Sequence, residues 1–178
     1  VEQINSVDAI SISTTQSPQY SRVVALANGS AEIIASLGHL DILVGRDVAS
    51  DVVSLESVEV VTSGHQIVAE KILSLNPDLV IVDALSGPSS ALLAIESAGI
   101  RIAKISEAWT LNDIDRKVSE IAQAIGTVDE GKNLIAALQI STSSVKQIPA
   151  GTRIAFLYLR GGSAIYLIGG KGSGTDSL

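Results

Sequence analysis

The chain has 178 residues, of which 46% are hydrophobic and 17% charged, and its formal net charge is -7. This length suffices for one domain of about 100–150 residues with chain left over. The negative charge argues against nucleic acid as a partner, because a phosphate backbone needs a basic surface. The absence of cysteine excludes disulfides, thiolate metal sites and thiol nucleophiles.

Residues 1–20 are rich in Ser, Thr, Gln and Asn and show little periodicity. This composition predicts a tether or disordered leader. A tether before a globular domain fits a surface-anchored lipoprotein, whereas an ordinary frayed terminus fits the composition equally well.

Residues 21–111 alternate between short β-branched runs and helical patterns. Strands are expected at 22–27, 42–45, 58–61, 79–82 and 100–105, and helices at 30–37, 67–75 and 88–97. The run at 79–82 is nearly all apolar, as expected for a central parallel strand covered on both faces. Strands separated by single helices predict right-handed crossovers and a mostly parallel sheet. We therefore expect an α/β, three-layer Rossmann-like lobe.

Residues 112–148 carry two helical patterns separated at Gly126. Asn112 is expected to cap the first helix and Thr127 the second, which runs to about Gln147. Together they predict one long, slightly broken helical rod.

Residues 149–178 predict a β-hairpin, with strands at 153–159 and 164–168 joined through Gly161 and Gly162. One hairpin after a long helix cannot bury its own apolar face. It therefore docks on the first domain, pairs with another molecule, or belongs to a second domain that the chain lacks. The last interpretation is preferred.

His65 follows Gly64 between a predicted strand and helix. In an open parallel sheet such loops lie at the carboxyl ends of the strands, where ligands bind. Neutral imidazole is a strong iron ligand, and glycine lets a flat macrocycle approach the backbone. Position alone nevertheless favours a solvent-facing loop histidine. His39, just after a helix end, is expected at the surface.

Three further residues carry alternatives. Glu32 in the first turn of a helix either compensates the helix dipole or protrudes to meet an arginine of a partner. Tyr158 and Arg160 are two apart in a strand and are expected to project together. A guanidinium favours the phenolate, which ligates ferric iron. A half-exposed pair on an edge strand fits the sequence equally well.

No pattern indicates an enzyme or an enzymatic cofactor. The glycine-rich run around Lys171 lacks the Ser or Thr that a phosphate loop needs after its lysine. A nucleotide-binding α/β enzyme is the alternative from another class, and the missing glycine fingerprint after 22–27 argues against it.

Segments 22–34, 37–47 and 72–81 together resemble the ABC-importer binding proteins for haem, vitamin B12 and siderophores. The segment Leu-Asn-Pro-Asp-Leu-Val at 75–80 is the most specific of them. In this family two lobes are joined by one rigid helix. The resemblance covers roughly residues 21–178.

The resemblance implies an organisation and a function. Residues 21–111 would be the N-terminal ligand-binding lobe, 112–148 the inter-lobe hinge helix, and 149–178 the first strands of a truncated C-terminal lobe. The protein would be extracytoplasmic, as a cell-surface lipoprotein or in the periplasm. It would capture haem for iron uptake and deliver it to an ABC permease and its ATPase. Haem would be transported cargo. A ferric siderophore or cobalamin is the alternative ligand, although only Trp109 supplies an aromatic near the expected cleft.

The resemblance also implies residue roles. Gly64 and His65 are similar to the first-lobe axial histidine site of the haem-binding branch. Tyr158 matches its second-lobe axial tyrosine, and Arg160 the arginine that hydrogen-bonds it. Glu32 falls where the family carries a glutamate that docks on permease arginines. Self-association of the truncated chain through its hairpin is a further alternative.

Overall fold

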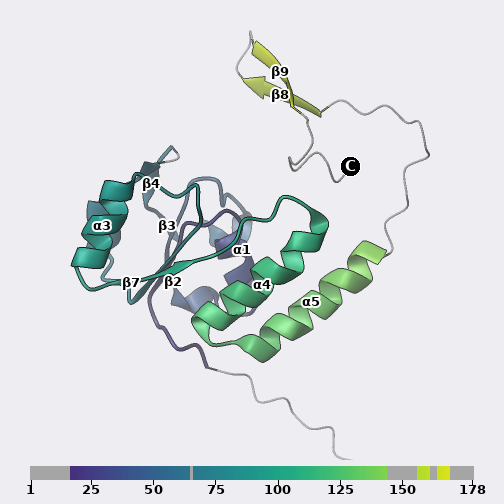
Figure 1. The fold of residues 1–178 in the computed structure, drawn as a ribbon, viewed down its shortest axis with the longest axis horizontal. Coiled ribbons are helices and arrows are strands. Elements are labelled where there is room, and N and C mark those ends of the chain that lie inside the picture. The colour runs from purple at the N-terminus through teal and green to yellow at the C-terminus, as the bar shows by residue number, and fades with distance from the viewer. Residues whose placement is uncertain (1–16, 65, 144–155, 161–163, 169–178) are drawn as a thin grey trace, which may run out of the picture.

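A five-stranded sheet between two sets of helices forms the main body of the protein (Figure 1). The computed structural model describes residues 17–64, 66–143, 156–160 and 164–168. The strands of the sheet are β1 (Val23–Ala25), β2 (Leu43–Arg46), β3 (Glu59–Val60), β6 (Leu79–Val82) and β7 (Arg101–Lys104). Their order is β3-β2-β1-β6-β7, and every pairing is parallel. The α/β, three-layer prediction is confirmed.

The helices cover both faces of this sheet. They are α1 (Ser30–Ser36), α2 (Ala69–Ser74), α3 (Ser89–Ser97), α4 (Leu111–Ile125) and α5 (Val128–Ser143). Alternate strand residues face opposite layers, because successive side chains of a strand point to opposite faces. Val23 thus packs in the core with α1 and α4, whereas Val24 packs in the core with α2 and α3. All four residues of β6 are fully buried, as predicted for the central strand.

The carboxylate of Asp78 joins the segment between α2 and β6 to the residues just before β1. It accepts hydrogen bonds from the amides of Ser21 (2.8 Å) and Arg22 (3.0 Å) and from the Ser21 hydroxyl (3.0 Å). Burial alone would raise the pKa of Asp78, but these hydrogen bonds outweigh it and lower the pKa below its usual value. The Leu-Asn-Pro-Asp segment therefore fixes the starts of β1 and β6 beside each other.

The helical region after β7 is present, but the expected continuous rod is wrong. Gly126 adopts a left-handed conformation (φ 85°) and reverses the chain after α4. Gln139 Nε2 donates to Asp115 Oδ2 at 2.6 Å, which joins the end of α5 to the start of α4. The two helices therefore lie side by side as an antiparallel hairpin (Figure 1).

The expected cap of α4 is wrong, whereas Thr127 stands directly before α5, as expected. Thr110 caps α4 and forms a capping box with Asp113, whereas Asn112 is already inside the helix. The buried Thr127 hydroxyl has no hydrogen-bond partner among the described residues.

Two further expectations are wrong. Where a loop was expected before α2, β4 (Thr62–Ser63) and β5 (Gln66–Ile67) form a short antiparallel hairpin. His39 is only 6% exposed, because it lies between α1 and the 3₁₀ turn Leu40–Ile42 that follows. The prediction of a surface histidine is therefore wrong.

The C-terminal hairpin is confirmed and is described by itself. Strand β8 (Phe156–Arg160) pairs antiparallel with β9 (Ala164–Ile168), and Tyr158 lies opposite Tyr166. Most of the predicted tether, the end of the second helix at Gln147 and the glycine-rich run fall outside the described residues.

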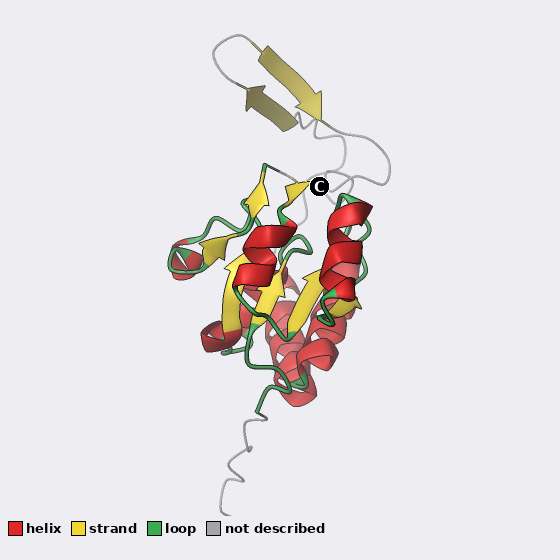
Figure 2. Ribbon diagram, turned by 90° about the vertical axis from the view of Figure 1, so that its left-hand side faces the viewer, coloured by secondary structure: helices red, strands yellow, loops and turns green. Residues whose placement is uncertain are grey.

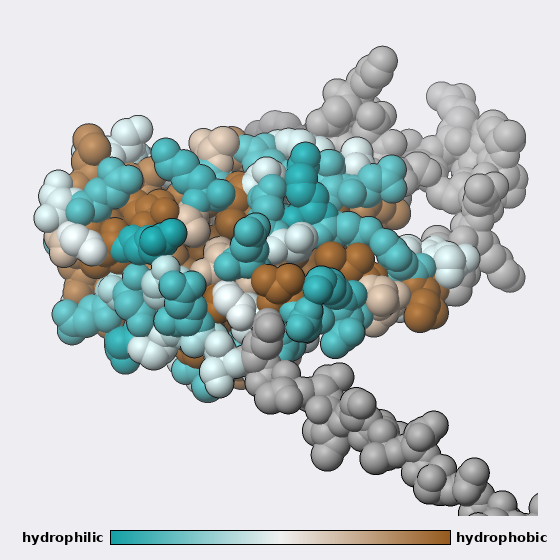
Figure 3. Space-filling view, turned by 60° about the horizontal axis from the view of Figure 1, so that its bottom comes forward, coloured by the Kyte–Doolittle hydropathy of each residue, from teal (hydrophilic) through white to brown (hydrophobic). Residues whose placement is uncertain are grey.

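The surface of the lobe is mixed. Figure 3 shows one face, on which hydrophilic side chains separate several apolar patches. Within the described ranges, no helix is long and apolar enough to cross a membrane.

Candidate ligand-binding site

The carboxyl ends of the parallel strands meet at one edge of the sheet, marked by the arrowheads in Figure 2. The chain proceeds outward from β1 to β2 and β3, then returns to place β6 on the other side of β1. The connections after β1 and β6 therefore lead to helices on opposite faces of the sheet. A crevice opens between two such connections, and ligands bind there in open α/β sheets.

A cavity of about 380 Å³ lies at this edge. Its volume falls at the lower end of the range of about 300–1,000 Å³ typical of ligand pockets. The lining comes from the loops after β1, β2 and β6 and from the β4–β5 hairpin. The lining residues are Leu26, Asn28, Asp47, Ala49, Thr62, Gly64, Ile67, Asp83, Leu85 and Ser86.

Asp83 holds two of these loops together. Its Oδ2 accepts from the amide of Asn28 at 3.0 Å, across the crevice. Its Oδ1 accepts from the amide of Leu85 at 3.1 Å and from the hydroxyl of Ser86 at 2.9 Å. Since the side chain is buried, these bonds are protected from water. Asp83 thereby fixes the loop after β1 against the loop after β6.

The opposite wall is built around Asp47. Its Oδ1 accepts from the amide of Ala49 at 2.7 Å. The hydroxyl of the buried Ser50 lies 2.8 Å from Asp47 Oδ2 and 3.0 Å from Glu32 Oε2. Its one proton serves one of the two carboxylates at a time.

The connection from β2 to β3 is folded around the buried guanidinium of Arg46. This group donates to the carbonyls of Ser50 (2.8 Å), Leu55 (3.0 Å) and Val58 (3.2 Å). These bonds hold the segment that follows Asp47 in place, and all of their acceptors are backbone carbonyls.

Gly64 reaches the cavity from the turn of the β4–β5 hairpin. Its φ of +57° is left-handed, and a Cβ added to it would meet no heavy atom within 4 Å. Open space therefore adjoins its backbone, as a flat ligand requires. His65, the next residue, lies outside the described residues.

The remaining predicted residues are placed less completely. Glu32 is half-buried on α1, and its carboxylate accepts from the Ser50 hydroxyl at 3.0 Å. Tyr158 and Arg160 lie in β8, for which the structure describes the backbone alone. The structure therefore brings Gly64 and Glu32 to the same edge of the lobe and does not place the second-lobe pair beside them.

One lysine of the lobe is buried. Lys117 on α4 is 5% exposed, and no carboxylate among the described residues lies within ion-pair distance of it. Burial lowers the pKa of Lys117, and four surrounding carboxylates oppose that shift. They belong to Asp83, Glu107, Glu120 and Glu32.

The described part of the chain offers no group of three His, Cys, Asp or Glu residues suited to a metal ion. The carboxylates at the cavity are already occupied by loop amides and hydroxyls.

The sequence predictions missed Asn28, Asp47 and Asp83. Each lies in the loop just after an apolar strand, at one to three residues from its end. A polar residue at the carboxyl end of a buried parallel strand was the signal that could have identified them.

Comparison with known proteins identifies the family. The sequence profile described as periplasmic binding protein matches residues 23–178. The chain belongs to this family.

Two relatives within it are the ABC transporter substrate-binding lipoprotein YvrC of Bacillus subtilis and a vitamin B12-binding protein of Vibrio campbellii. The first is 24% identical over 143 residues, which cover 79% of this chain and 45% of YvrC. The second is 27% identical over 152 residues, which cover 84% of this chain and 55% of that protein. The chain thus spans about half the length of these relatives.

Solved structures of similar periplasmic binding proteins are haem-binding proteins by name. Four structures of the haem-binding protein HmuT, three of them of single-residue variants, match with TM-scores of 0.70 to 0.76. The match at 0.76 has 28% identity and covers 100% of this chain and 64% of HmuT. RhuT from Roseiflexus sp. RS-1 matches at 0.70 and 29%, covering 83% of this chain and 58% of RhuT. HutB of Vibrio cholerae matches with a TM-score of 0.70 and 27% identity, and the match covers 82% of this chain and 58% of HutB. The resemblance inferred from the sequence is confirmed.

Proposed function

We propose that this chain provides the first lobe and the inter-lobe helices of an extracytoplasmic substrate-binding protein, which captures haem and delivers it to an ABC permease and its ATPase. The observation that carries the proposal is the cavity at the crevice between β1 and β6. It lies where this fold binds ligands, in a lobe similar to three haem-binding proteins.

Apolar side chains at the same edge suit a large, flat and mostly apolar ligand. Leu85 is 68% exposed, Trp109 46% and Val48 42%, and they come from the loops after three different strands. An exposed apolar surface of this kind marks a binding site in a soluble protein. A porphyrin together with the facing lobe would remove these side chains from water.

Iron ligation is assigned to residues on two sides of the ligand. His65 would supply an imidazole from the β4–β5 turn, where Gly64 leaves room at the cavity. Tyr158 in β8 would supply a phenolate, and Arg160 would stabilise it. This is ligand binding without catalysis, so haem is cargo.

Docking on the permease is assigned to Glu32, as the resemblance to the family implies. A permease arginine would have to displace the Ser50 hydroxyl from its carboxylate. Glu32→Gln should weaken stimulation of the importer's ATPase if this docking contact forms. Equal stimulation by Glu32→Gln and by the wild-type protein would remove the docking role.

The vitamin B12-binding relative supports cobalamin as the second candidate ligand. Both ligands are tetrapyrrole-like metal macrocycles, so the shape of the cavity alone does not separate them. Axial ligation does, because ferric haem gains a shifted Soret band when an imidazole and a phenolate bind its iron.

The test is titration of the full-length two-lobed protein with hemin and, separately, with cyanocobalamin. We expect a Soret shift with hemin that is lost in His65→Ala combined with Tyr158→Phe. An unchanged spectrum in that double variant would overturn the ligand assignment. Thermal stabilisation by cyanocobalamin without a response to hemin would replace haem by cobalamin.

A further inference from the structure

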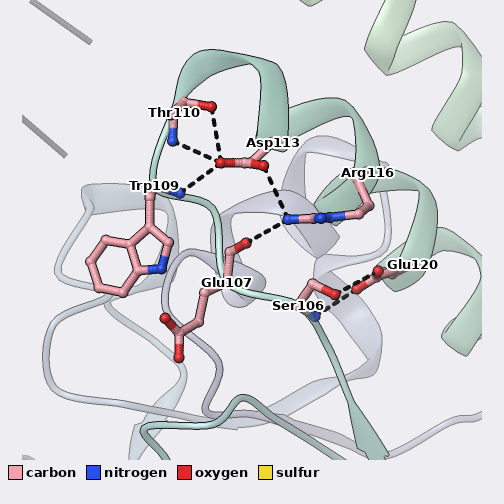
Figure 4. Close-up of polar contacts among 7 residues, drawn as sticks. All are labelled: Ser106, Glu107, Trp109, Thr110, Asp113, Arg116 and Glu120. Carbon is pink, nitrogen blue, oxygen red and sulfur yellow. Dashed lines mark hydrogen bonds and ion pairs between the residues drawn. The ribbon is translucent and has the colours of Figure 1, made fainter. Parts of the chain in front are cut away.

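Trp109, the chain's only tryptophan, is 46% exposed. The loop that carries it is held by several hydrogen bonds. The loop joins β7 to α4. The Trp109 amide donates to Asp113 Oδ2 at 3.1 Å, and the same oxygen accepts from the amide and hydroxyl of Thr110 at 3.0 and 2.9 Å (Figure 4). The backbone on the helix side of the indole is therefore fixed by the capping box.

The other side of the loop is fixed as well. Arg116 donates to the Glu107 carbonyl at 3.0 Å while it pairs with Asp113 at 3.1 Å. Glu120 accepts from the amide and the hydroxyl of Ser106 at 2.6 and 2.8 Å. An exposed aromatic side chain on such a support loses little conformational entropy when it binds a ligand.

This loop begins at the same edge of the sheet as the cavity. The amide of Ile105 donates to the Val82 carbonyl at 2.8 Å, so the loop starts beside the end of β6. The residue after Val82 is Asp83, which lines the cavity.

The indole is free to contact a ligand. In Figure 4 the side chains of Trp109 and Glu107 extend from the loop on the side opposite the capping turn of Thr110 and Asp113. No hydrogen bond to another described residue occupies the indole N–H. The indole is therefore exposed on a loop that begins at the carboxyl edge of the sheet.

We propose that Trp109 forms one wall of the ligand site and packs its indole against a flat aromatic macrocycle held at the cavity. The proposal rests on the proposed function and assigns a specificity-determining contact to it. Aromatic packing of this kind corresponds to a change in affinity of about 2- to 12-fold, the equivalent of 0.5–1.5 kcal/mol. Iron ligation is separate, so the contact should alter affinity without altering the spectrum.

The experiment is a hemin titration of the full-length two-lobed protein, followed at the Soret band. The variants are Trp109→Ala and Trp109→Phe, with Leu93→Ala as the matched control. Leu93 is 61% exposed on α3, away from the loop that carries Trp109. We expect about 2- to 12-fold weaker binding for Trp109→Ala, a smaller loss for Trp109→Phe and none for Leu93→Ala. The position of the Soret maximum should stay constant.

The outcomes separate this inference from the proposed function. Equal affinity of the wild-type protein and Trp109→Ala would overturn the role of Trp109 and leave haem binding intact. A displaced Soret maximum in Trp109→Ala would also overturn it, because the indole would then act through the iron ligands. Absence of hemin binding by the wild-type protein would instead refute the proposed function.

Discussion

The contact between α4 and α5 depends on the lack of a side chain at Gly131. A Cβ built on this buried glycine would lie 2.5 Å from the Cβ of Ala122 on α4. Real Cβ atoms do not approach so closely, and Ala122 is itself buried, with no flexible side chain to move aside. Gly131→Ala therefore forces the two helices apart.

Two effects of opposite sign determine how Gly131→Ala changes the free energy of unfolding. Alanine in place of glycine in a helix interior stabilises by about 1 kcal/mol. Overpacking of a well-packed contact destabilises by about 1–3 kcal/mol. We expect Gly131→Ala to lower the free energy of unfolding by about 1 kcal/mol net, within a range of about 0–2 kcal/mol.

A double-mutant cycle isolates the methyl–methyl contact. Urea unfolding would be measured for the wild-type chain, Gly131→Ala, Ala122→Gly and the double variant. Ala122→Gly should destabilise the wild-type background by about 1 kcal/mol or more and cost less when Gly131→Ala is present, because it removes the clash. Additive effects, or a gain in stability from Gly131→Ala alone, would refute the packing argument.

Two further predictions concern hydrogen bonds outside the cavity. Thr110→Ala should lower the free energy of unfolding by about 1 kcal/mol, because it removes the side-chain cap of α4. Thermal unfolding measures this loss, and an unchanged melting temperature would contradict the role of the capping box. Hydrogen bonds lower the pKa of Asp78 and Asp113 in the folded state. Their stabilisation is thus complete above the unfolded pKa of about 3.9 and is lost as the pH falls through the lower folded pKa values. Asp78→Asn should flatten the fall of the urea midpoint below about pH 4, and an unchanged slope would contradict this origin.

The parts of the fold that local sequence determines were predictable. Strand β6 was identified because all four of its residues are apolar, which is typical of a strand covered on both faces. The C-terminal hairpin was identified from two β-branched and aromatic runs around adjacent glycines.

The errors arose where distant contacts decide the structure. The break at Gly126 was visible, but reversal of the chain there also requires Gly131 to meet Ala122 across the helix pair. The β4–β5 hairpin has only two residues in each strand, too few for a period-2 pattern. The burial of His39 likewise depends on the packing of its surroundings.

The candidate site was predictable in position and less so in composition. The place of Gly64 at the carboxyl edge followed from the expected strand and helix order, and the cavity includes this glycine. The role of Asp83 depends on the amide of Asn28, which is 55 positions away in the sequence. No local pattern reveals such a partner.

The central claim is that the cavity at the carboxyl edge holds haem, and blocking it tests this most directly. Ala49 is exposed and lines the cavity, so Ala49→Trp would fill it without entering the core. Ala98, exposed at the end of α3 on the opposite edge, provides the control Ala98→Trp. In hemin titrations of the full-length two-lobed protein, we predict that Ala49→Trp weakens binding about tenfold or more while Ala98→Trp leaves it unchanged. Equal affinity of Ala49→Trp and the wild-type protein would contradict the account.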